Sequence, residues 1–326
     1  MKSRAGTLDM LLAALDGRPP PATDWDAVIA LANRSLLTPT LCQALRRAGA
    51  LDGLPADAAD FLAFIDARNL ERNRRLRAQL GAVIAALNRR GITPVLLKGA
   101  APLYAAPERC PPARITSDLD IGVPAARLRM ARAALRRIGY AALPGAREMA
   151  RTGDPGVVDL RASAASGTEV ARGPLRAIVP SPEARALHWI LHDLLKEGDY
   201  WRGRIDLRHL RDLAELAAAE PVDWGAVRAA GADRATRNAI DTQLVTLADL
   251  FGTRVPAESR HLLTRLQHAR RLFTARYRVI GAPLRLAGQI AWIAHRTRRA
   301  DDLMARGPGD LLRRAVRVFG ESRAKL

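Results

Sequence analysis

The sequence predicts an α+β protein in which a short segment with strands lies between two helical regions. Residues 93–163 alternate between β-rich runs and helical patterns, and no other part of the sequence shows this alternation. Before this segment, and again after Pro182, apolar residues recur at helical spacing. With 326 residues the chain is long enough for one large domain or two modest ones.

The N-terminal region, residues 1–90, is predicted to be helical. Residues 1–60 indicate short helices, with Pro-rich punctuation at RPPPATDW. From Asp57 to about Arg90 the apolar side chains follow one long helical pattern. Gly91 comes directly after it, at the position where a helix C-cap is expected.

The middle region, residues 91–180, carries three predicted strands separated by two predicted helices. The strand candidates are TPVLLKG, SDLDIGV and GVVDLRAS, the last of which covers residues 156–163. A helix is expected to start at Gly99, and PAARLRMARAALRRIGY is expected to form the other, with Pro124 near its N-terminus. The order β-α-β-α-β predicts a small α/β unit.

The C-terminal region, residues 181–326, is predicted to be entirely helical. The expected helices cover residues 182–196, 204–219, 223–231, 234–252, 256–279, 283–299 and 309–323. No internal repeat and no long low-complexity linker interrupts this part of the sequence.

The net charge of +19 invites a nucleic-acid interpretation. Only four of the 52 basic residues are Lys, which indicates a coding bias toward Arg and lowers the weight of the charge. The excess is concentrated: residues 261–326 hold 15 Arg or Lys against 4 Asp or Glu, a net charge of +11. This basic C-terminus is an ordinary Arg-rich surface, a contact for RNA or another polyanion, or a pair of helices at a membrane surface.

Cysteine content and hydropathy indicate the cellular compartment in which the protein is expected. Cys42 and Cys110 make neither a disulfide framework nor a metal knuckle, so a reducing cytoplasm is expected. The longest apolar run, residues 279–294, contains Pro283 and Arg285 and is too short to span a membrane. We expect a cytoplasmic protein, with contact at the membrane periphery as an alternative.

Two acids inside an apolar run, in ITSDLDIGVP, are the strongest chemical signal. Residues i and i+2 of a strand point to the same face, so Asp118 and Asp120 would project together and repel each other. A divalent cation with oxygen ligands relieves this repulsion, and a third acid would complete a two-metal site. Asp159 in VVDLR is the best third candidate, with Asp154 and Glu169 as alternatives; a turn or N-cap would explain SDLD without any metal.

A basic turn precedes these acids. Lys98 is one of the few lysines that the sequence keeps, and its compact ammonium group suits a phosphate or a carboxylate cluster. Gly99 allows the close approach of backbone to a phosphate at the start of a helix. A lysine at a strand end in solvent is the plain alternative.

Together PVLLKGAAPLY, ARITSDLDIGV, VVDLR and the helical C-terminal half resemble the uncharacterised nucleotidyltransferase family of the DNA polymerase β-like superfamily. The resemblance extends from about residue 25 to about residue 300 and is sharpest between residues 94 and 122. It implies a minimal nucleotidyltransferase core, a short mixed sheet with helices, inside a mostly helical chain.

The resemblance also implies the site. Asp118, Asp120 and Asp159 match the acids that hold two Mg²⁺ ions, for which Mn²⁺ is a substitute. The residues expected at the nucleotide are Lys98, Gly99, Arg114, Ser117, Arg204 and Asp206. Two departures stand out: Ala100 replaces the usual Ser of the phosphate turn, where Arg109 or Arg114 would supply contacts instead, and Arg161 replaces the usual His two residues after the third acid.

The segment HWILHDLLKEGDYWRGRIDLRHLRDLAEL also resembles the family. His188 and His192 share a helix face, but the sequence lacks the Glu and the third ligand of a zinc site. Packing on the core, or a hydrogen bond to an acid such as Asp206, is expected instead. Arg204 and Asp206 are expected either on a salt-bridged surface or in a cleft opposite the acids, where they would help to hold the nucleotide or the acceptor.

These observations predict a Mg²⁺-dependent transfer of a nucleoside monophosphate from a triphosphate such as ATP to an acceptor hydroxyl. The acceptor is a small molecule, a protein side chain or an RNA end. A catalytically degenerate member that senses nucleotides or binds a partner is the alternative, favoured by the two departures and opposed by the intact set of acids. A purely helical nucleic-acid binder would not explain the α/β unit.

Overall fold

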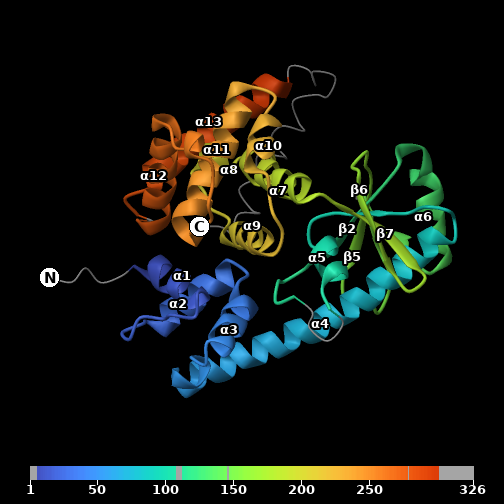
Figure 1. Cartoon of the computed structure of the whole chain (residues 1–326), viewed down its shortest axis with the longest axis horizontal. Helices are drawn as coiled ribbons and strands as arrows, with labels where there is room; N and C mark the ends of the chain where they lie inside the picture. The colour runs from blue at the N-terminus through green and yellow to red at the C-terminus, as the bar shows by residue number, and fades with distance from the viewer. Residues whose placement is uncertain (1–5, 108–111, 145–146, 278, 301–326) are drawn as a thin grey trace. The chain divides into compact units, whose positions relative to one another are not determined.

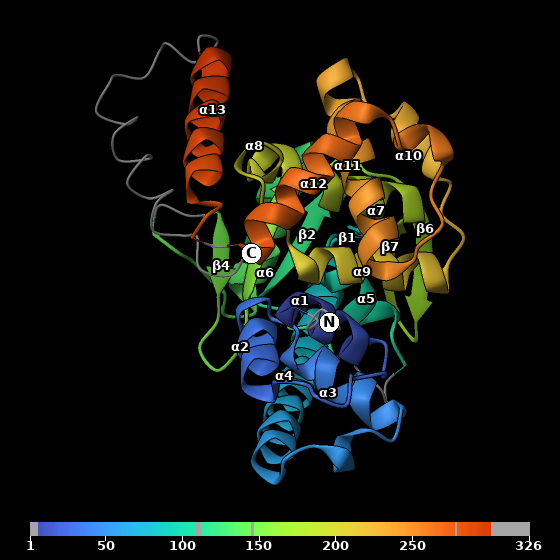
Figure 2. The same cartoon turned by 90° about the vertical axis from the view of Figure 1, so that its left-hand side faces the viewer.

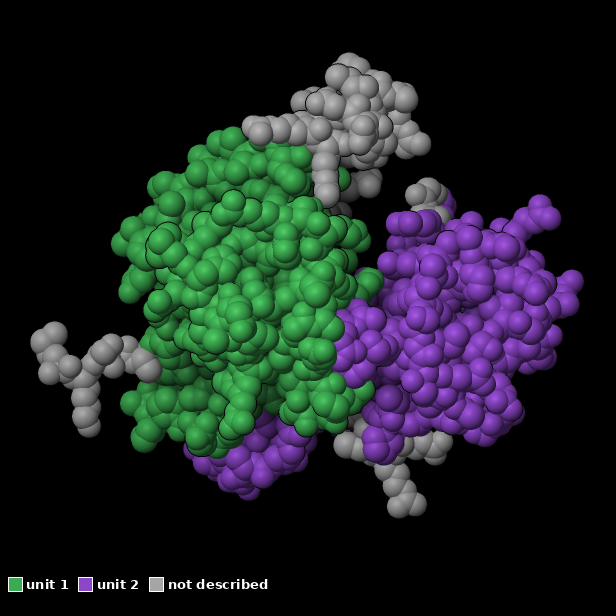
Figure 3. Space-filling model, turned by 45° about the horizontal axis from the view of Figure 1, so that its top comes forward, with its two compact units in different colours: residues 1–37, 186–326 green, residues 38–185 purple. Residues whose placement is uncertain are grey.

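The protein folds into two compact units. The computed structural model describes residues 6–107, 112–144, 147–277 and 279–300. Residues 1–37 and 186–326 form unit 1, and residues 38–185 form unit 2 (Figure 3). The described residues are 61% helical and contain a seven-stranded mixed sheet, which confirms the predicted α+β class.

Unit 2 is built on a 33-residue helix, α4 (Ala56–Asn88), which follows α3 (Thr38–Arg47). The helix ends where the sequence predicts, because Gly91 takes a left-handed φ of +65° and Ile92 N–H donates to Leu87 O at 3.1 Å. Figure 1 shows α4 running along the sheet. Its C-terminal half supplies Leu76, Leu80, Val83, Ile84 and Leu87 to the core.

The sheet of unit 2 has the strand order β3-β4-β5-β2-β1-β7-β6. Its strands are β1 (Val95–Leu96), β2 (Asp118–Val123), β3 (Ala141–Ala142), β4 (Glu148–Ala150), β5 (Val157–Ala162), β6 (Gly167–Arg172) and β7 (Leu175–Pro180). The helix α5 (Ala100–Ala105) lies between β1 and β2, and the helix α6 (Leu128–Arg137) follows β2 and precedes β5. The three predicted strands are therefore present as β1, β2 and β5.

Four further strands were not predicted from the sequence, and each has a physical reason. The strands β3 and β4 are two and three residues long, too short to show a period. The hairpin of β6 and β7 carries exposed polar residues, including Glu169 and Arg176, and its longest apolar run is only the four residues 177–180. These strands extend the sheet on both sides of the predicted three.

One face of the sheet packs against helices, and this leaves the other face to polar side chains. Leu119, Ile121, Val158 and Leu160 point into a core shared with α4, α5 and α6. Because side chains alternate along a strand, the residues between them must project from the opposite face. Those residues include the acids singled out in the sequence.

Unit 1 is helical in its described part, as predicted. Its elements are α1 (Thr7–Leu15), α2 (Trp25–Arg34), α7 (Pro182–Leu191), a π-helical turn (His192–Lys196), α8 (Asp199–Arg202), α9 (Leu207–Ala219), α10 (Trp224–Ala229), α11 (Arg234–Phe251), α12 (Leu262–Arg276) and α13 (Ala282–Ala300). The helix α7 begins in unit 2 and carries the chain into unit 1. The predicted helix 309–323 lies outside the described residues.

The helices α9, α10 and α11 each begin at an aspartate whose side chain caps the helix. Asp206, Asp223 and Asp233 each accept a hydrogen bond from a backbone N–H three residues on, at 3.0, 3.0 and 2.7 Å. The helix predicted at 256–279 begins later, at Leu262, because a 3₁₀ turn at Ala257–Ser259 precedes it. In the described part of the chain no helix is both long and apolar enough to cross a membrane.

Candidate active site

Strand pairing brings the three predicted acids to one face of the sheet. The strands β2 and β5 are parallel, and Asp120 stands directly opposite Asp159 in their register. Asp118 lies two residues before Asp120 on β2, and therefore on the same face. We call Asp118, Asp120 and Asp159 the acid face of unit 2.

Two cations contact the acid face. Lys98, which follows β1, places Nζ 3.1 Å from Asp120 Oδ1. Arg161 on β5 donates from Nη2 to Asp159 Oδ2 at 2.5 Å, and the same nitrogen contacts Asp120 Oδ1. Arg161 stands opposite Gly122 in the register, and the space beside Gly122 is taken by Ser163, whose Cβ would lie 2.5 Å from a Cβ at that position. The cation that separates Asp120 from Asp159 in this structure is therefore Arg161.

Burial governs the electrostatics of Asp120, whose side chain is 2% exposed. Burial raises the pKa of Asp120, Lys98 lowers it, Asp118 raises it, and Arg161 lowers it by less than Lys98 does. The net direction is upward. The two nearby cations therefore only partly offset the free-energy cost of ionising this buried carboxylate.

Side chains of α4 hold the N-terminal ends of both acid-bearing strands. Arg72 donates to the carbonyl of Thr116, and to those of Ser117 at 3.4 Å and Pro155 at 2.9 Å. Gln79 exchanges two hydrogen bonds with the backbone of Gly156, at 2.8 and 3.3 Å. Polar residues inside a long helix are thus explained: they fix the strand ends, and with them the spacing of the acids.

The segment before β2 is fastened to α4 in the same way. Asn73 is fully buried and donates to the carbonyls of Pro112 and Arg114, both at 2.9 Å. Asn69 donates to the carbonyl of Ala113 at 2.8 Å. This part of the chain is therefore ordered by side chain–backbone bonds rather than by regular structure.

The predicted phosphate turn brings Lys98 and Arg114 together across Gly99. Lys98 adopts a φ of +44°, which is uncommon for a residue with a side chain. A Cβ on Gly99 would meet Arg114 Nη1 at 2.7 Å, so glycine is what lets this guanidinium group approach the turn. Arg114 Nη1 also donates to Thr116 Oγ1 at 3.3 Å, and Ser117 Oγ donates to Asp118 Oδ1 at 2.8 Å.

The alternatives to Asp159 have other partners. Asp154 accepts from Arg151 Nη2 at 2.9 Å and from the Tyr140 hydroxyl. Glu169 lies on β6 and accepts from Arg176 Nη1 at 3.1 Å. Neither is paired in register with Asp120, whereas Asp159 is, and this favours Asp159 as the third acid.

Sequence reasoning missed Glu148. This residue on β4 stands directly opposite Asp159 in an antiparallel register, so it faces the same way as the acid face. The signal was absent from the sequence, because β4 is too short to be recognised as a strand. A fourth carboxylate therefore borders the site.

The acid face fits a divalent cation on one structural observation. Within the described residues, Asp159 Oδ1 is buried and has no hydrogen-bond partner, although its other oxygen binds Arg161. Carboxylate oxygens are the ligands that Mg²⁺ prefers. Asp118, Asp120 and Asp159 do not bring three ligand atoms within 4.8 Å of one another, as the acids and histidine of another group in unit 1 do, so their role as ligands of an ion stays a prediction.

Arg204 and Asp206 belong to unit 1, whereas the acid face belongs to unit 2. Burial lowers the pKa of Arg204, whose carbonyl accepts from Arg271 Nε at 2.9 Å. Asp206 is the N-cap of α9. Their expected role at the nucleotide stays a prediction.

A second group of carboxylates lies in unit 1, and we call it the buried cluster: Asp193, Asp206 and His209. Their ligand atoms lie within 4.8 Å of one another, so by distance the group could hold a metal ion; in the described part of the chain it is the only such group of three. His209 Nδ1 lies 2.8 and 2.9 Å from the two oxygens of Asp193, and Arg208 Nη2 lies 3.3 Å from Nε2. A carboxylate can only accept, so Nδ1 carries a proton and donates to Asp193.

Charge explains this arrangement without a metal. Burial lowers the pKa of His209, but Asp206 and Asp193 together outweigh it, so the net pKa is raised. The imidazole is held as the donor of a buried ion pair.

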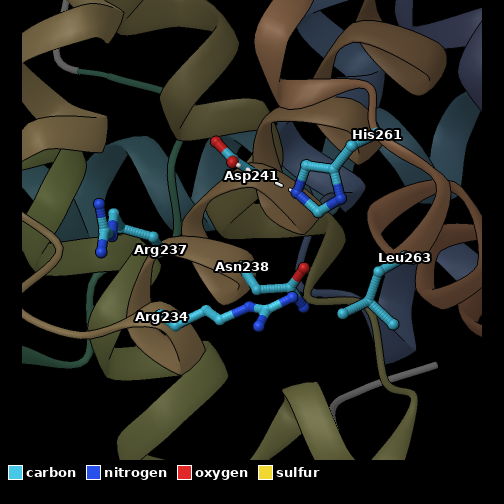
Figure 4. A pocket seen from close by; sticks show the side chains of 6 residues that line it. All are labelled: Arg234, Arg237, Asn238, Asp241, His261 and Leu263. Atoms are coloured by element: carbon cyan, nitrogen blue, oxygen red, sulfur yellow. Dashed lines mark ion pairs between the residues drawn. The ribbon is translucent and has the colours of Figure 1, made fainter.

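Figure 4 shows a pocket of about 280 Å³ in unit 1, lined by Arg234, Arg237, Asn238, Asp241, His261 and Leu263. Asp241 is already paired, with Arg228 Nε at 2.6 Å and His261 Nε2 at 3.6 Å. The arginines that line the pocket are exposed. These features are those of a salt-bridged surface rather than of a catalytic centre.

Comparison with known proteins supports the family resemblance. Residues 21–151 match the model of a family described as uncharacterised nucleotidyltransferase. The match includes Lys98, Asp118 and Asp120 and ends before Asp159. No curated protein and no solved structure matches the chain.

Proposed function

We propose, from the match to a nucleotidyltransferase family and from the acid face, that the protein transfers a nucleoside monophosphate from a triphosphate to an acceptor hydroxyl. The match supports a general role in nucleotidyl transfer. The donor, the dependence on Mg²⁺ and the acceptor are our proposals. The observation that carries them is the register that sets Asp120 opposite Asp159 on the face that also bears Asp118.

Each residue of the site has a proposed role. Asp118, Asp120 and Asp159 would hold Mg²⁺, which when bound neutralises the triphosphate and lowers the pKa of the acceptor hydroxyl. Lys98 and Arg114, which meet at Gly99, would contact the phosphates as a point charge and as a planar fork. Ser117 holds the Asp118 carboxylate by the bond at 2.8 Å.

The transfer itself requires little covalent chemistry from the chain. The acceptor oxygen forms a bond to the α-phosphorus while the bond to pyrophosphate breaks, and the hydroxyl proton must leave. The proton would pass to solvent water, because Asp159 Oδ1, which is buried and lacks a partner among the described residues, is the oxygen proposed to bind the ion. Lys98 would offset the charge on the departing pyrophosphate.

A degenerate, nucleotide-sensing protein is the second candidate, and one observation favours it. Arg161 already bridges Asp120 and Asp159, so it neutralises the charge that a cation would neutralise. Ala100 in the phosphate turn points the same way, since it lacks the hydroxyl of the usual serine.

Calorimetric titration with ATP, CTP, GTP and UTP, with and without Mg²⁺, tests the proposal. The variants are Asp118→Asn with Asp120→Asn, and Glu169→Gln as the matched control, because Glu169 is a carboxylate on the same sheet but pairs with Arg176. We expect one triphosphate to bind in a Mg²⁺-dependent way, the double variant to lose this binding, and the control to keep it.

Transfer is then followed with the bound triphosphate labelled at its α-phosphate. Label that reaches an acceptor in a cell extract, and not in the double variant, supports transfer. Binding that persists without Mg²⁺ or without the acids contradicts it and favours the sensor. The predicted contact of the basic C-terminus with a polyanion or a membrane surface is separate from this site.

A further inference from the structure

Exposed apolar side chains are concentrated in one part of unit 1. Ten of the thirteen exposed large hydrophobic side chains among the described residues lie between residues 262 and 290. They are Leu262, Leu263, Leu266, Phe273, Tyr277, Val279, Ile280, Leu284, Leu286 and Ile290. Scattered exposed leucines need no explanation, but a group of this size on consecutive elements does.

The helix α13 turns its apolar face away from the rest of unit 1. Its packed side is fixed by contacts with α8, beside which Figure 2 draws it. Trp292 is buried beneath the guanidinium group of Arg202, 3.8 Å from its ring, and a Cβ on Gly288 would meet Trp201 O at 2.2 Å. The helix therefore cannot rotate to bury its other face without losing these contacts.

The opposite face of α13 is apolar throughout its described length. Pro283, Leu286, Ala287 and Ile290 recur at i, i+3, i+4 and i+7, and all are exposed. Leu286 and Ile290 are 61% and 60% exposed. On a helix at the surface of a water-soluble protein, the face turned to solvent usually carries charged or polar side chains.

The preceding helix and turn continue the pattern. On α12, Leu262, Leu266 and Phe273 are exposed at i, i+4 and i+11, while His268 and Arg271 are buried on the other side. The turn between α12 and α13 exposes Val279 and Ile280 by 86% and 70%. We call these exposed residues of α12, the turn and α13 the apolar surface.

In the same stretch of sequence every Asp, Glu, Lys or Arg position is an arginine. Residues 259–300 contain ten Arg and no Asp or Glu. Arg265, Arg276 and Arg296 are exposed; Arg276 pairs with Asp9 at 2.7 Å. Apolar side chains beside arginines, without any acid, are typical of elements that lie at the interface of an anionic membrane.

We propose that the apolar surface docks on an anionic lipid membrane. Charge selects this occupant over two others. A second copy would bring the exposed Arg260, Arg265, Arg276 and Arg296 against like charges. The segment 301–326 is itself net basic, with six Arg or Lys against four acids. Nucleic acid would satisfy the arginines but would leave Val279, Ile280, Leu286 and Ile290 in water. The proposal does not depend on the proposed function of unit 2.

Vesicle sedimentation of the full chain tests the proposal. The vesicles contain phosphatidylcholine alone or phosphatidylcholine with phosphatidylserine. The variant is Leu286→Glu with Ile290→Glu, which should fold because both side chains are exposed. The matched control is Phe64→Glu, an exposed apolar residue of α4 in unit 2.

The wild type and Phe64→Glu are expected to bind the anionic vesicles, and the double variant to bind them at least about tenfold more weakly. Binding to phosphatidylcholine alone should be weaker, and salt should reduce the difference. Equal binding by the wild type and the double variant would overturn the proposal, as would no binding by either. A wild-type dimer that the double variant disrupts, or stronger binding to RNA than to the vesicles, would also overturn it.

Discussion

The acid face of unit 2 and the buried cluster of unit 1 contain similar residues but differ in how their hydrogen bonds are completed. In the buried cluster, both oxygens of Asp193 contact His209, and Asp206 caps α9. In the acid face, Asp159 leaves one buried oxygen without a partner in the described part of the chain. Its two cations, Lys98 and Arg161, are both partly exposed.

This difference teaches that proximity of ligand atoms is a weaker guide to a metal site than the accounting of donors and acceptors. The buried cluster meets the distance criterion of a metal site, yet its histidine already serves as a donor. The ligand atoms of the acid face lie farther apart, but one of them, Asp159 Oδ1, has no hydrogen-bond partner in the described part of the chain. Both oxygens of Asp193, in contrast, are already bonded to His209, so Asp159 is the better candidate to bind an ion.

The largest expected effect is on stability, in the buried cluster. Asp193→Asn leaves the raised-pKa imidazole of His209 without its main partner inside unit 1, and should cost about 3–5 kcal/mol. Thermal unfolding followed by circular dichroism measures this loss. Asp249→Asn is the matched control, because Asp249 pairs with His268 Nε2 at 3.1 Å but is half exposed, and should cost at most about 1 kcal/mol.

Asp120→Asn sharpens the same contrast, because it should leave the unfolding temperature at or above that of the wild type. Burial raises the pKa of Asp120, so its ionised form opposes folding at neutral pH and a neutral side chain is tolerated. A loss of stability equal to that of Asp193→Asn would show that both groups have the same structural role.

The second effect is on binding, in the acid face. Asp120→Asn should weaken the Mg²⁺-dependent binding of a triphosphate by about 100-fold or more, since it removes a proposed ligand of the metal. Isothermal titration measures the change, with Glu148→Gln beside it. Glu148 borders the acid face without being opposite Asp120, so its removal should have a smaller effect.

Much of this contrast depends on register, which the sequence does not reveal. The spacing of Asp118 and Asp120 predicts a shared face on one strand, because the period of a strand is two. The alignment of Asp120 with Asp159 comes from the pairing of β2 with β5, two strands that lie far apart in the sequence. Arg161 of β5, which bonds to Asp120, is 41 residues away from it. Glu148 was missed because three residues show no period.

Side-chain direction set the other limit of prediction. The sequence showed that Arg161 stands two residues after Asp159, but not that its guanidinium group reaches Asp120 on the neighbouring strand. The periodicity of residues 283–299 predicted a helix, which α13 confirms. It could not show which side of that helix packs, because an apolar stripe normally faces the core.

The third effect concerns the cation between the acids. Arg161→Gln removes a positive charge from Asp120 and Asp159, so Mn²⁺ and Mg²⁺ should bind about tenfold more tightly. The measurement is Mn²⁺ binding without nucleotide. The control is Arg176→Gln on β7, which pairs with exposed Glu169 and should leave the affinity unchanged. Unchanged affinity in both variants would mean that Arg161 and the metal do not compete.

The smallest effect is on the pH dependence of stability. The folded pKa of His209 is raised above its ordinary value of 6.5, so its pairing stabilises unit 1 fully below pH 6.5 and less as the pH rises through the folded pKa. The unfolding temperature of the wild type should therefore fall toward that of His209→Gln at alkaline pH. A difference between the two proteins that does not change with pH would contradict the charged pair.

The most direct test of the contrast is the binding of Mn²⁺, observed by electron paramagnetic resonance, to the wild type, Asp120→Asn and Asp193→Asn, with His209→Gln as a second variant of the buried cluster. We predict that the wild type binds Mn²⁺, that Asp120→Asn does not, and that the buried-cluster variants which remain folded bind it as the wild type does. Binding that survives Asp120→Asn and disappears in His209→Gln would place the metal in unit 1 and contradict the assignment of the site to the acid face.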